Sequence, residues 1–422
     1  MKSFLNWYSG LNIYLKLIPF LLLYLAVSFV FAPDKLVSDE IRYMLYARYL
    51  VNGIYSPPPP NIDLWAGRGY SALLAPFLFL KFPIMVLRLL NAFLLYFSLI
   101  IFNKTIELYT SVKKVSLYTI FLGLYFPIYV SLPAIMTECL AWFLISSICY
   151  LFVKSFRQQS ISWKPIFICG VTIAFLTMVK VIFGYVIVLT IVSSLFMQLF
   201  SKFRLAAKRS TYIFSFSFIL CLPYLIYTYN LTGKIFYWTN CSGMSLYTMS
   251  TPYARDYGDW KSEESMLKNP NYKHFVQSIS KLSTIDKDVA YKKQANENIR
   301  QHPGKFLLNC LSNIGRLFFN YPYTNTAQSN TTFFYLAPNI FVFVFIIITL
   351  GLGIIHYKKL PVEIVLLLFV IMIYLAGSVL VSAYCRMFMV TMPFWMLFFF
   401  YILNTIILNK VKNTDKKAID LI

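Results

Sequence analysis

Charged residues are scarce in this chain. Only 13% of its 422 residues are Asp, Glu, Lys or Arg, whereas soluble domains carry about 25%. Hydrophobic residues make up 59% of the sequence, and the mean hydropathy is +0.65. Apolar runs long enough to cross a bilayer recur along the chain. The composition therefore excludes an ordinary soluble domain and predicts an all-α polytopic membrane protein.

Acidic residues are the rarer kind of charge. There are 16 of them against 38 Lys and Arg, which gives a net charge of +22. Such an excess can indicate a nucleic-acid partner. Here, however, the basic residues fall in short stretches between apolar runs, which is the arrangement that orients membrane helices. The charge therefore favours contact with membrane lipid and no nucleic acid.

Motifs for metals and nucleotides are also missing. The histidines, His274, His302 and His356, are scattered, and no CxxC pair occurs, so a Cys/His metal site is not expected. No Walker motif and no GxGxxG motif is present. The seven cysteines are spread singly. Cys241 and Cys310 fall in the same polar segment, and a disulfide between them stays open.

The apolar runs predict about ten membrane spans. The first is expected to be retained, because no small-residue cleavage site follows it. The predicted spans are residues 17–33, 83–103, 115–132, 138–154, 166–179, 181–199, 211–229, 335–356, 361–381 and 387–408. They divide the chain into a membrane module at 1–229, a loop domain at 230–334 and C-terminal membrane helices at 335–422.

The distribution of Lys and Arg predicts the orientation. With the N-terminus in the cytoplasm, the inner segments hold eighteen of these residues and the short outer segments hold six. Short cytoplasmic loops are the basic ones in membrane proteins. We therefore expect both termini in the cytoplasm and the loop domain outside.

Three regions are then expected to face outward: 34–82, 230–334 and the turn at 382–386. Asp39–Leu50 has the periodicity of an amphipathic helix lying in the membrane interface, with Ile41, Leu45 and Tyr49 on one side. Residues 70–82 are apolar but too short to span. In the loop domain, 286–301 has a helical pattern, and Pro303 is expected in the first turn of a helix that runs to Phe319.

The first outer region begins with an acid pair, Ser38-Asp39-Glu40, directly after the first span. Carboxylates this close to hydrocarbon are costly unless they face a watery cavity or a partner. Asp39 is therefore a candidate general base, and Glu40 a candidate for orienting a substrate. The alternative is a helix N-terminus, capped by Ser38 or Asp39 and with Glu40 near the helix dipole.

Other charged residues lie at expected outer ends of spans. Glu138 is a candidate for hydroxyl binding or base work, or a helix-start charge capped by Thr137. Lys180 and Arg386 are candidates for phosphate binding; the alternatives are a snorkelling lysine and an interfacial anchor or acid partner. Arg68 lies between two glycines, which would let a ligand approach the backbone, or it is an ordinary loop charge. Arg42 and Arg88 are expected to pair with the carboxylates.

Several motifs occur in an order that resembles the GT-C glycosyltransferases. The resemblance is greatest to the family 39-like branch of protein O-mannosyltransferases and lipid A aminoarabinose transferases. It covers most of the chain, although Arg68 and Met387-Phe388 depart from the usual pattern. The motifs are Asp39-Glu40, Gly67-Arg68-Gly69-Tyr70, Thr137-Glu138, Leu176-Thr177-Met178-Val179-Lys180, Gly233-Lys234-Ile235, Ser242-Gly243-Met244, His302-Pro303-Gly304-Lys305-Phe306 and Tyr384-Cys385-Arg386.

This resemblance implies a GT-C-like fold and transfer of a sugar from a polyprenyl-phosphate donor, with inversion. The acceptor would be a glycolipid, a polysaccharide or a protein. The implied location is the bacterial inner membrane with the site outside. Asp39, Glu40 and Glu138 would serve catalysis, and Lys180, Arg386 and Arg68 would bind the donor phosphate. No cofactor is implied with certainty, and a divalent metal on the acid pair stays open. A polysaccharide polymerase and a transporter or flippase remain alternatives, although no inverted repeat is visible.

Overall fold

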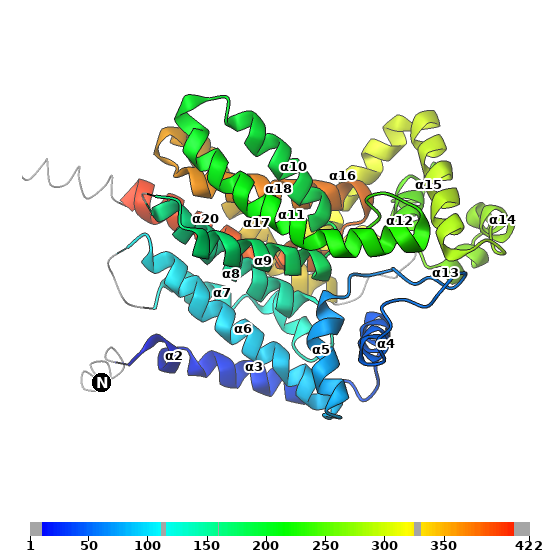
Figure 1. The fold of residues 1–422 in the computed structure, drawn as a ribbon, viewed down its shortest axis with the longest axis horizontal. Helices are drawn as coiled ribbons and strands as arrows, with labels where there is room; N and C mark the ends of the chain where they lie inside the picture. Colours follow the sequence, from blue (N-terminus) through cyan, green and yellow to red (C-terminus); the bar gives the residue numbers. More distant parts are fainter. Residues whose placement is uncertain (1–10, 111–114, 159, 325–330, 409–422) are drawn as a thin grey trace, which may run out of the picture.

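The computed structural model describes residues 11–110, 115–158, 160–324 and 331–408. Throughout these ranges the regular structure is helical and no strand is formed, which confirms the expected all-α class. Most helices run side by side as one bundle, and the remainder gather at one end of it (Figure 1).

The bundle consists of apolar helices joined by short turns. In chain order its elements are α2 (Ile13–Lys16), α3 (Ile18–Val30), α6 (Ile84–Glu107), α7 (Leu117–Gly123), η1 (Phe126–Ser131), α8 (Glu138–Arg157), α9 (Trp163–Val179), α10 (Phe183–Met197), η2 (Ser201–Phe203), α11 (Arg204–Thr232), α17 (Thr331–Ile355), η3 (Tyr357–Lys359), α18 (Val362–Val381), α19 (Cys385–Met389), α20 (Met392–Phe400) and the π-helical η4 (Tyr401–Leu408). Both α2 and η4 lie at the end of the bundle opposite the loop domain (Figure 1).

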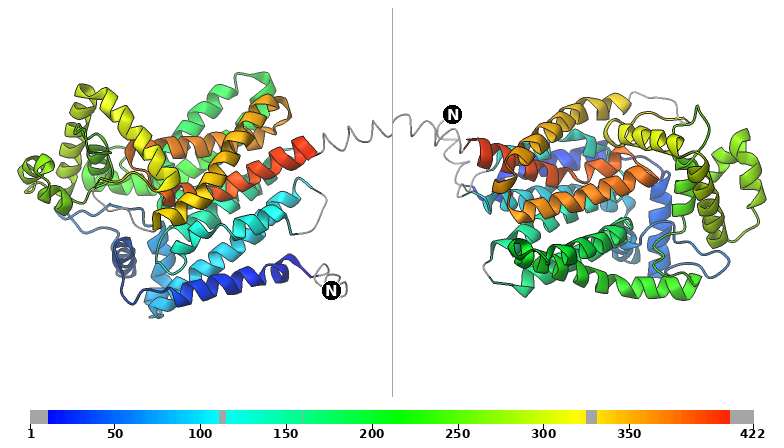
Figure 2. Two further views of the ribbon diagram at one scale, coloured as in Figure 1. Left: turned by 180° about the vertical axis from the view of Figure 1, so that it is seen from behind. Right: turned by 90° about the horizontal axis from the view of Figure 1, so that it is seen from above.

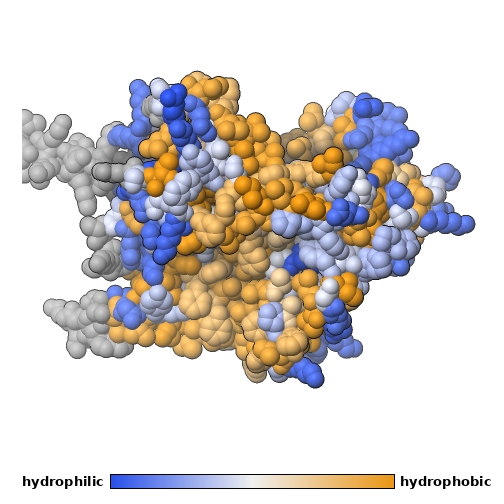
Figure 3. Space-filling model, viewed as in Figure 1, coloured by the Kyte–Doolittle hydropathy of each residue, from blue (hydrophilic) through white to orange (hydrophobic). Residues whose placement is uncertain are grey.

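On the face that Figure 3 shows, an apolar belt covers the bundle between two polar ends. Five helices, α6, α8, α11, α17 and α18, are long and apolar enough to cross a membrane. Five further apolar helices are shorter: Ile18–Val30, Gly69–Phe79, Trp163–Val179, Phe183–Met197 and Met392–Asn404. The structure therefore fits a multi-pass membrane protein, but it does not confirm ten full-length spans.

The predicted span at 115–132 is wrong as one continuous helix. α7 ends at Gly123, and the chain continues through Tyr125 into the 3-10 helix η1. Pro127 lies in the first turn of η1, where it has no amide hydrogen to donate back to the preceding turn. The chain then turns through residues 132–137 into α8, and the amide of Ile135 in this turn donates a hydrogen bond to Glu40.

The loop between α3 and α6 forms two helices that cross the bundle direction. α4 (Asp39–Val51) is seen end-on in Figure 1 and from the side in the right view of Figure 2. It packs through Tyr43, Tyr46 and Ala47 and leaves Ile41 and Leu45 exposed, as an interfacial helix requires. α5 (Gly69–Phe79) packs against α4 and α9.

Two glycines let the first loop touch the end of α9. A Cβ at Gly67 would lie 2.0 Å from the carbonyl oxygen of Met178, and one at Gly69 would lie 2.7 Å from the backbone of Val179. Only glycine allows this contact between two backbones. The Gly-x-Gly motif therefore positions the turn that carries Lys180. The backbone that lies against these glycines belongs to α9 of this chain and not to a ligand.

The loop domain consists of α12 (Ser242–Met249), α13 (Glu263–Lys268), α14 (Pro270–Ser278), α15 (Thr284–Gln301) and α16 (Pro303–Phe319). The predicted helices at 286–301 and 303–319 are confirmed, with Pro303 in the first turn of α16. The domain has a small core of its own, formed by Met244, Tyr247, Met266, Tyr272, Val276, Ile279, Tyr291 and Ala295. It extends beyond the bundle on the side of α4 (Figure 1).

Candidate active site

Asp39 meets two arginines at the junction of the bundle and the loop domain. Its Oδ2 accepts a hydrogen bond of 2.8 Å from Nη1 of Arg386, and its Oδ1 lies 3.5 Å from Nη1 of Arg42. Asp39 and Arg386 are 347 residues apart in the chain. The Asp39 and Arg386 side chains keep 25% and 39% of their surface exposed, so the pair is open to water. The expectation that Arg42 partners a carboxylate is confirmed.

The backbone at the start of α4 directs the side chains of Asp39 and Glu40 to different partners. Ser38 has φ of 50°, an uncommon value for a residue other than glycine, and its side chain makes no capping hydrogen bond. The buried Glu40 instead accepts the amide of Val37 at 2.9 Å and the amide of Ile135 at 2.7 Å. Glu40 thus anchors the start of α4 to the turn before α8. The expected substrate role of Glu40 is not supported, because its oxygens are engaged with backbone.

A second acid–base pair lies beside the first. Nζ of Lys180 donates a hydrogen bond of 2.9 Å to Oε1 of Glu138, whose side chain is 1% exposed. Lys180 follows the last turn of α9, and Glu138 opens α8. Oε2 of Glu138 and the hydroxyl of Thr137 are buried without a hydrogen-bond partner among the residues the structure describes. Thr137 therefore does not cap α8 with its side chain.

The five charged side chains form one electrostatic unit: Asp39, Arg42, Glu138, Lys180 and Arg386. Burial favours a raised pKa for Asp39, but the positive charges of Arg386, Arg42 and Lys180 outweigh it and hold the pKa below its usual range. Burial likewise favours a lowered pKa for Arg386, while the charges of Glu138 and Asp39 raise it above its usual value. Asp39 is therefore ionised and Arg386 fully charged near neutral pH.

The mouth cavity, which we define by Asp39, Arg42, Trp65, Trp260, Tyr335 and Arg386 among its lining residues, has a volume of about 610 Å³. Its remaining lining residues are Ser38, Cys241, Ser245, Asn320, Ser382, Tyr384, Cys385 and Met387. The rings of Trp65 and Trp260 meet edge to face at 6.5 Å, and the guanidinium of Arg42 lies 4.6 Å from the centre of the Trp65 ring. The cavity therefore combines one carboxylate, two guanidinium groups and aromatic walls.

Arg68 is not a ligand-binding residue in this structure. Its guanidinium donates to the carbonyl oxygens of Tyr55, Ala66 and Asp63, and it stacks on Tyr46 with its carbon 3.2 Å from the ring centre. Arg68 is 2% exposed. Because three backbone carbonyls and a ring occupy the guanidinium, it stabilises the first loop, and the expected contact with donor phosphate is not supported.

The expectation for Arg88 is corrected, and the structure bears on two questions that the sequence left open, the Cys241–Cys310 disulfide and a metal on the acid pair. Cys241 and Cys310 are both free, so they form no disulfide. Arg88 donates to the carbonyl oxygen of Pro33 and not to a carboxylate. Asp39 and Glu40 face different partners, and in the described part of the chain no three His, Cys, Asp or Glu side chains are grouped to hold a metal ion. The donor set of the acid pair therefore does not fit a divalent cation.

Sequence reasoning missed much of the aromatic wall. Trp65, Trp260 and Tyr335 were not selected from the sequence, and Tyr384 entered only beside Arg386 in the last of the ordered motifs. Trp260 lies in the long polar segment before α13, and the presence of a single tryptophan there was the only sequence indication of a binding surface. Large aromatic rings in a mostly polar segment are a usable indicator of a binding surface.

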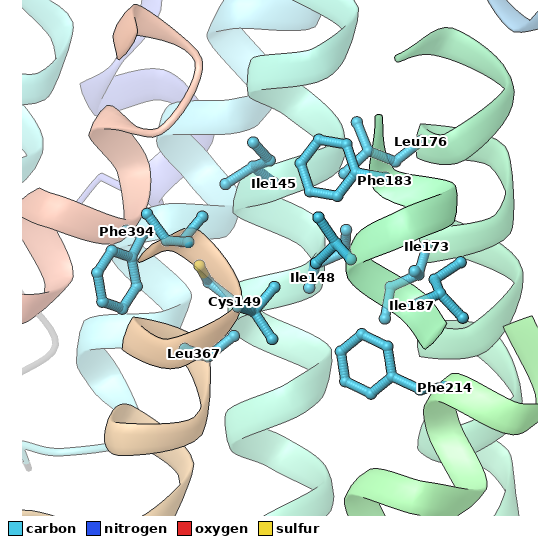
Figure 4. Close-up of a pocket in the computed structure, with 13 residues that line it drawn as sticks. Ile145, Ile148, Cys149, Ile173, Leu176, Phe183, Ile187, Phe214, Leu367 and Phe394 are labelled. Carbon is cyan, nitrogen blue, oxygen red and sulfur yellow. The ribbon is translucent and has the colours of Figure 1, made fainter. Parts of the chain in front are cut away.

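A small pocket inside the bundle is of a different kind (Figure 4). It measures about 30 Å³, and its lining is aliphatic, aromatic or thiol, with no charged or amide group. Side chains from α8, α9, α10, α11, α18 and α20 point into it, among them Ile148, Ile187 and Phe394 (Figure 4). Because it lacks polar partners and has room for little more than one water, it is a packing gap and not a ligand site.

No protein-family model matches the chain, and no curated protein matches it significantly. Among solved structures, the chain is similar to ArnT from Cupriavidus metallidurans, a crystal structure bound to undecaprenyl phosphate. The match has 13% sequence identity and a TM-score of 0.38, and it covers 89% of this chain and 77% of the other. A likeness this slight carries no functional argument, so the functional conclusion below is built on the site.

Proposed function

We propose that this chain is an integral membrane glycosyltransferase that moves a sugar, a hexose or a pentose, from a polyprenyl-phosphate donor to an acceptor hydroxyl at the extracytoplasmic face of a bacterial inner membrane. The observation that supports it most is the meeting of Asp39 and Arg386 in an aromatic-walled cavity at the edge of the apolar belt. This arrangement offers a base and phosphate-binding cations where a lipid-linked head group would arrive.

The proposed reaction is one displacement at the anomeric carbon. The acceptor oxygen forms a bond to that carbon as the bond from the carbon to the phosphate oxygen breaks. The proton of the acceptor hydroxyl passes to Asp39, and the polyprenyl phosphate leaves with the electron pair of the broken bond. Because the chain supplies no nucleophile in this scheme, the configuration at the anomeric carbon is inverted.

Arg386 is the proposed phosphate anchor. Its one hydrogen bond within the described residues goes to Asp39, which leaves the other N–H groups of its fork for phosphate oxygens. Arg42, which lines the same cavity, and Lys180, which does not, both act electrostatically on Asp39 and would add positive charge around the phosphate. We assign Glu138 to holding Lys180 in place, since the two are already joined and Glu138 is fully enclosed.

A transporter is the second functional class that intramembrane charges suggest. Transporters place such charges near the middle of the membrane between repeated halves. The clustered charges of this chain lie where the bundle meets the loop domain, so the observation favours an enzyme. A polysaccharide polymerase would use the same chemistry on a longer acceptor and falls within the proposal.

The direct test is transfer by purified protein in lipid nanodiscs supplied with labelled polyprenyl-phosphate sugars and candidate acceptors. Asp39→Asn should lower the rate by roughly 10²- to 10⁴-fold, because it removes the proton acceptor. Asp34→Asn makes the same chemical change at an exposed residue of the same loop and should leave the rate unchanged. Full activity of Asp39→Asn would remove Asp39 from the mechanism.

A further inference from the structure

A second cavity adjoins the mouth cavity on the loop-domain side. It measures about 320 Å³ and shares two lining residues, Arg42 and Trp65, with the mouth cavity. The other lining residues are Asn61, Ile62, Asp63, Asn240, Met244, Glu263, Thr284, Lys287, Asp288 and Tyr291. We call it the side cavity. Because Arg42 and Trp65 form the common wall, a ligand held in the side cavity would end close to Asp39.

The side cavity is lined by groups suited to hydroxyl recognition. Amides, carboxylates and a threonine alternate with the aromatic rings of Trp65 and Tyr291. The side chain of Asn61 is exposed at this lining, so its amide can donate to and accept from a hydroxyl group that enters the side cavity.

The charges around the side cavity argue against an anionic ligand. Glu263 accepts a hydrogen bond of 2.8 Å from Lys287, and Asp288 accepts one of 2.9 Å from Lys292. Oδ1 of Asp63 accepts hydrogen bonds from the hydroxyl of Tyr46 and from the amide of Trp65, so it is engaged as well, and Arg42 adds a third positive charge. The acids and bases around the side cavity are thus balanced, in contrast to the mouth cavity, where two arginines face one aspartate. A phosphate is favoured in the mouth cavity and a neutral, hydroxyl-rich group in the side cavity.

We propose that the side cavity binds the sugar units of a neutral glycan acceptor, whose terminal hydroxyl crosses Trp65 and reaches Asp39. This inference rests on the proposed function, since it names the acceptor class of that reaction. Arg42 and Trp260 already contact the ring of Trp65, so polar contacts with the lining residues, and not stacking on that ring, would hold the sugar units. A growing polysaccharide and the head group of a glycolipid present the same chemistry.

The first test measures binding directly and needs no turnover. Saturation-transfer NMR with maltotriose, mannotriose and chitotriose as probes should detect binding to the protein in nanodiscs. Asn61→Leu keeps the approximate size of the side chain and removes its amide, and it should weaken binding by about 3- to 10-fold. Asn271→Leu makes the same change at an exposed residue outside the cavity and should have no effect. Asn61→Trp, at an exposed lining position, should block the side cavity.

The second test separates this inference from the proposed function. Wild type should transfer sugar to the bound trisaccharide or to a glycolipid carrying the same sugars, and the better of these two acceptors identifies the source. Asn61→Trp should lose this transfer yet still release polyprenyl phosphate by donor hydrolysis. Donor turnover without glycan binding, or transfer to Ser/Thr peptides instead of glycans, would overturn the inference alone. Absence of donor turnover with every acceptor would overturn the proposed function.

Discussion

Two clusters of charge in this protein have similar composition and different surroundings. In the loop domain, Nζ of Lys261 lies 2.8 Å from Asp256 and 3.3 Å from Asp259, and the three side chains are 1%, 6% and 2% exposed. At the mouth cavity, Asp39 bonds to Arg386 at a similar distance, yet both side chains face open space. The first cluster is complete, whereas the second has capacity left for a ligand.

The arginines of the two regions differ in the same way. Arg316 on α16 is fully buried, and its guanidinium donates to the carbonyl oxygens of Pro322, Tyr257 and Gly258 and to Asn313. Arg386 makes one hydrogen bond within the described part of the chain, to Asp39. The comparison teaches that burial of a charge does not identify a site. Unused hydrogen-bonding capacity beside a cavity does.

The largest effect on stability is expected in the buried cluster of Lys261, Asp256 and Asp259. Lys261→Met should destabilise the loop domain by about 3–5 kcal/mol, because it leaves two buried carboxylates without their cation. Thermal unfolding and limited proteolysis of the loop domain in nanodiscs would measure it. Lys268→Met removes an exposed lysine paired with Glu264 and should leave unfolding unchanged. Equal stability of the two variants would show that the cluster of Lys261, Asp256 and Asp259 does not stabilise the loop domain.

The next largest effect is expected at the mouth cavity, in the cluster of Asp39 and Arg386. It concerns binding of the donor and not the stability of the fold. Arg386→Ala should weaken binding of a polyprenyl-phosphate sugar by about 10- to 100-fold, because it removes charge-assisted hydrogen bonds. Arg386→Lys keeps the charge without the fork and should lie between wild type and Arg386→Ala. Binding is measured by titration of the donor into protein in nanodiscs. Unchanged donor affinity with a lowered melting temperature would place Arg386 in the same structural class as Arg316.

Much of the fold followed from local patterns in the sequence. Helix α15 and the start of α16 at Pro303 were predicted because periodicity and a first-turn proline are local signals. The predicted span at 115–132 failed because apolar composition does not reveal where a helix breaks. The helix ends at Gly123, and the chain continues into a 3-10 helix with Pro127 in its first turn.

The candidate site followed from the sequence only in part. Asp39, Lys180 and Arg386 were selected through the ordered resemblance, and spacing alone gives no reason for residues 347 apart to meet. Glu40 and Arg68 look as functional as their neighbours in sequence, yet backbone partners occupy both. Which side chain of an adjacent pair faces the cavity depends on the backbone at Ser38, and that is a tertiary property.

The smallest expected effect concerns the acid limb of the pH profile of activity. It tests how the cations around Asp39 at the mouth cavity control the pKa of that carboxylate. The pKa of Asp39 is held below its usual range by three cations, so its basic, ionised form persists to low pH. In the plot of kcat/KM against pH, activity should fall only as pH drops through this lowered pKa. Arg42→Ala removes one of the cations, so the pKa of Asp39 should rise and the acid limb should move to higher pH by about a few tenths of a unit. Arg48→Ala changes an exposed arginine on the same helix and should not move it. A shift to lower pH in Arg42→Ala would show that the group controlling the acid limb is not a carboxylate stabilised by Arg42.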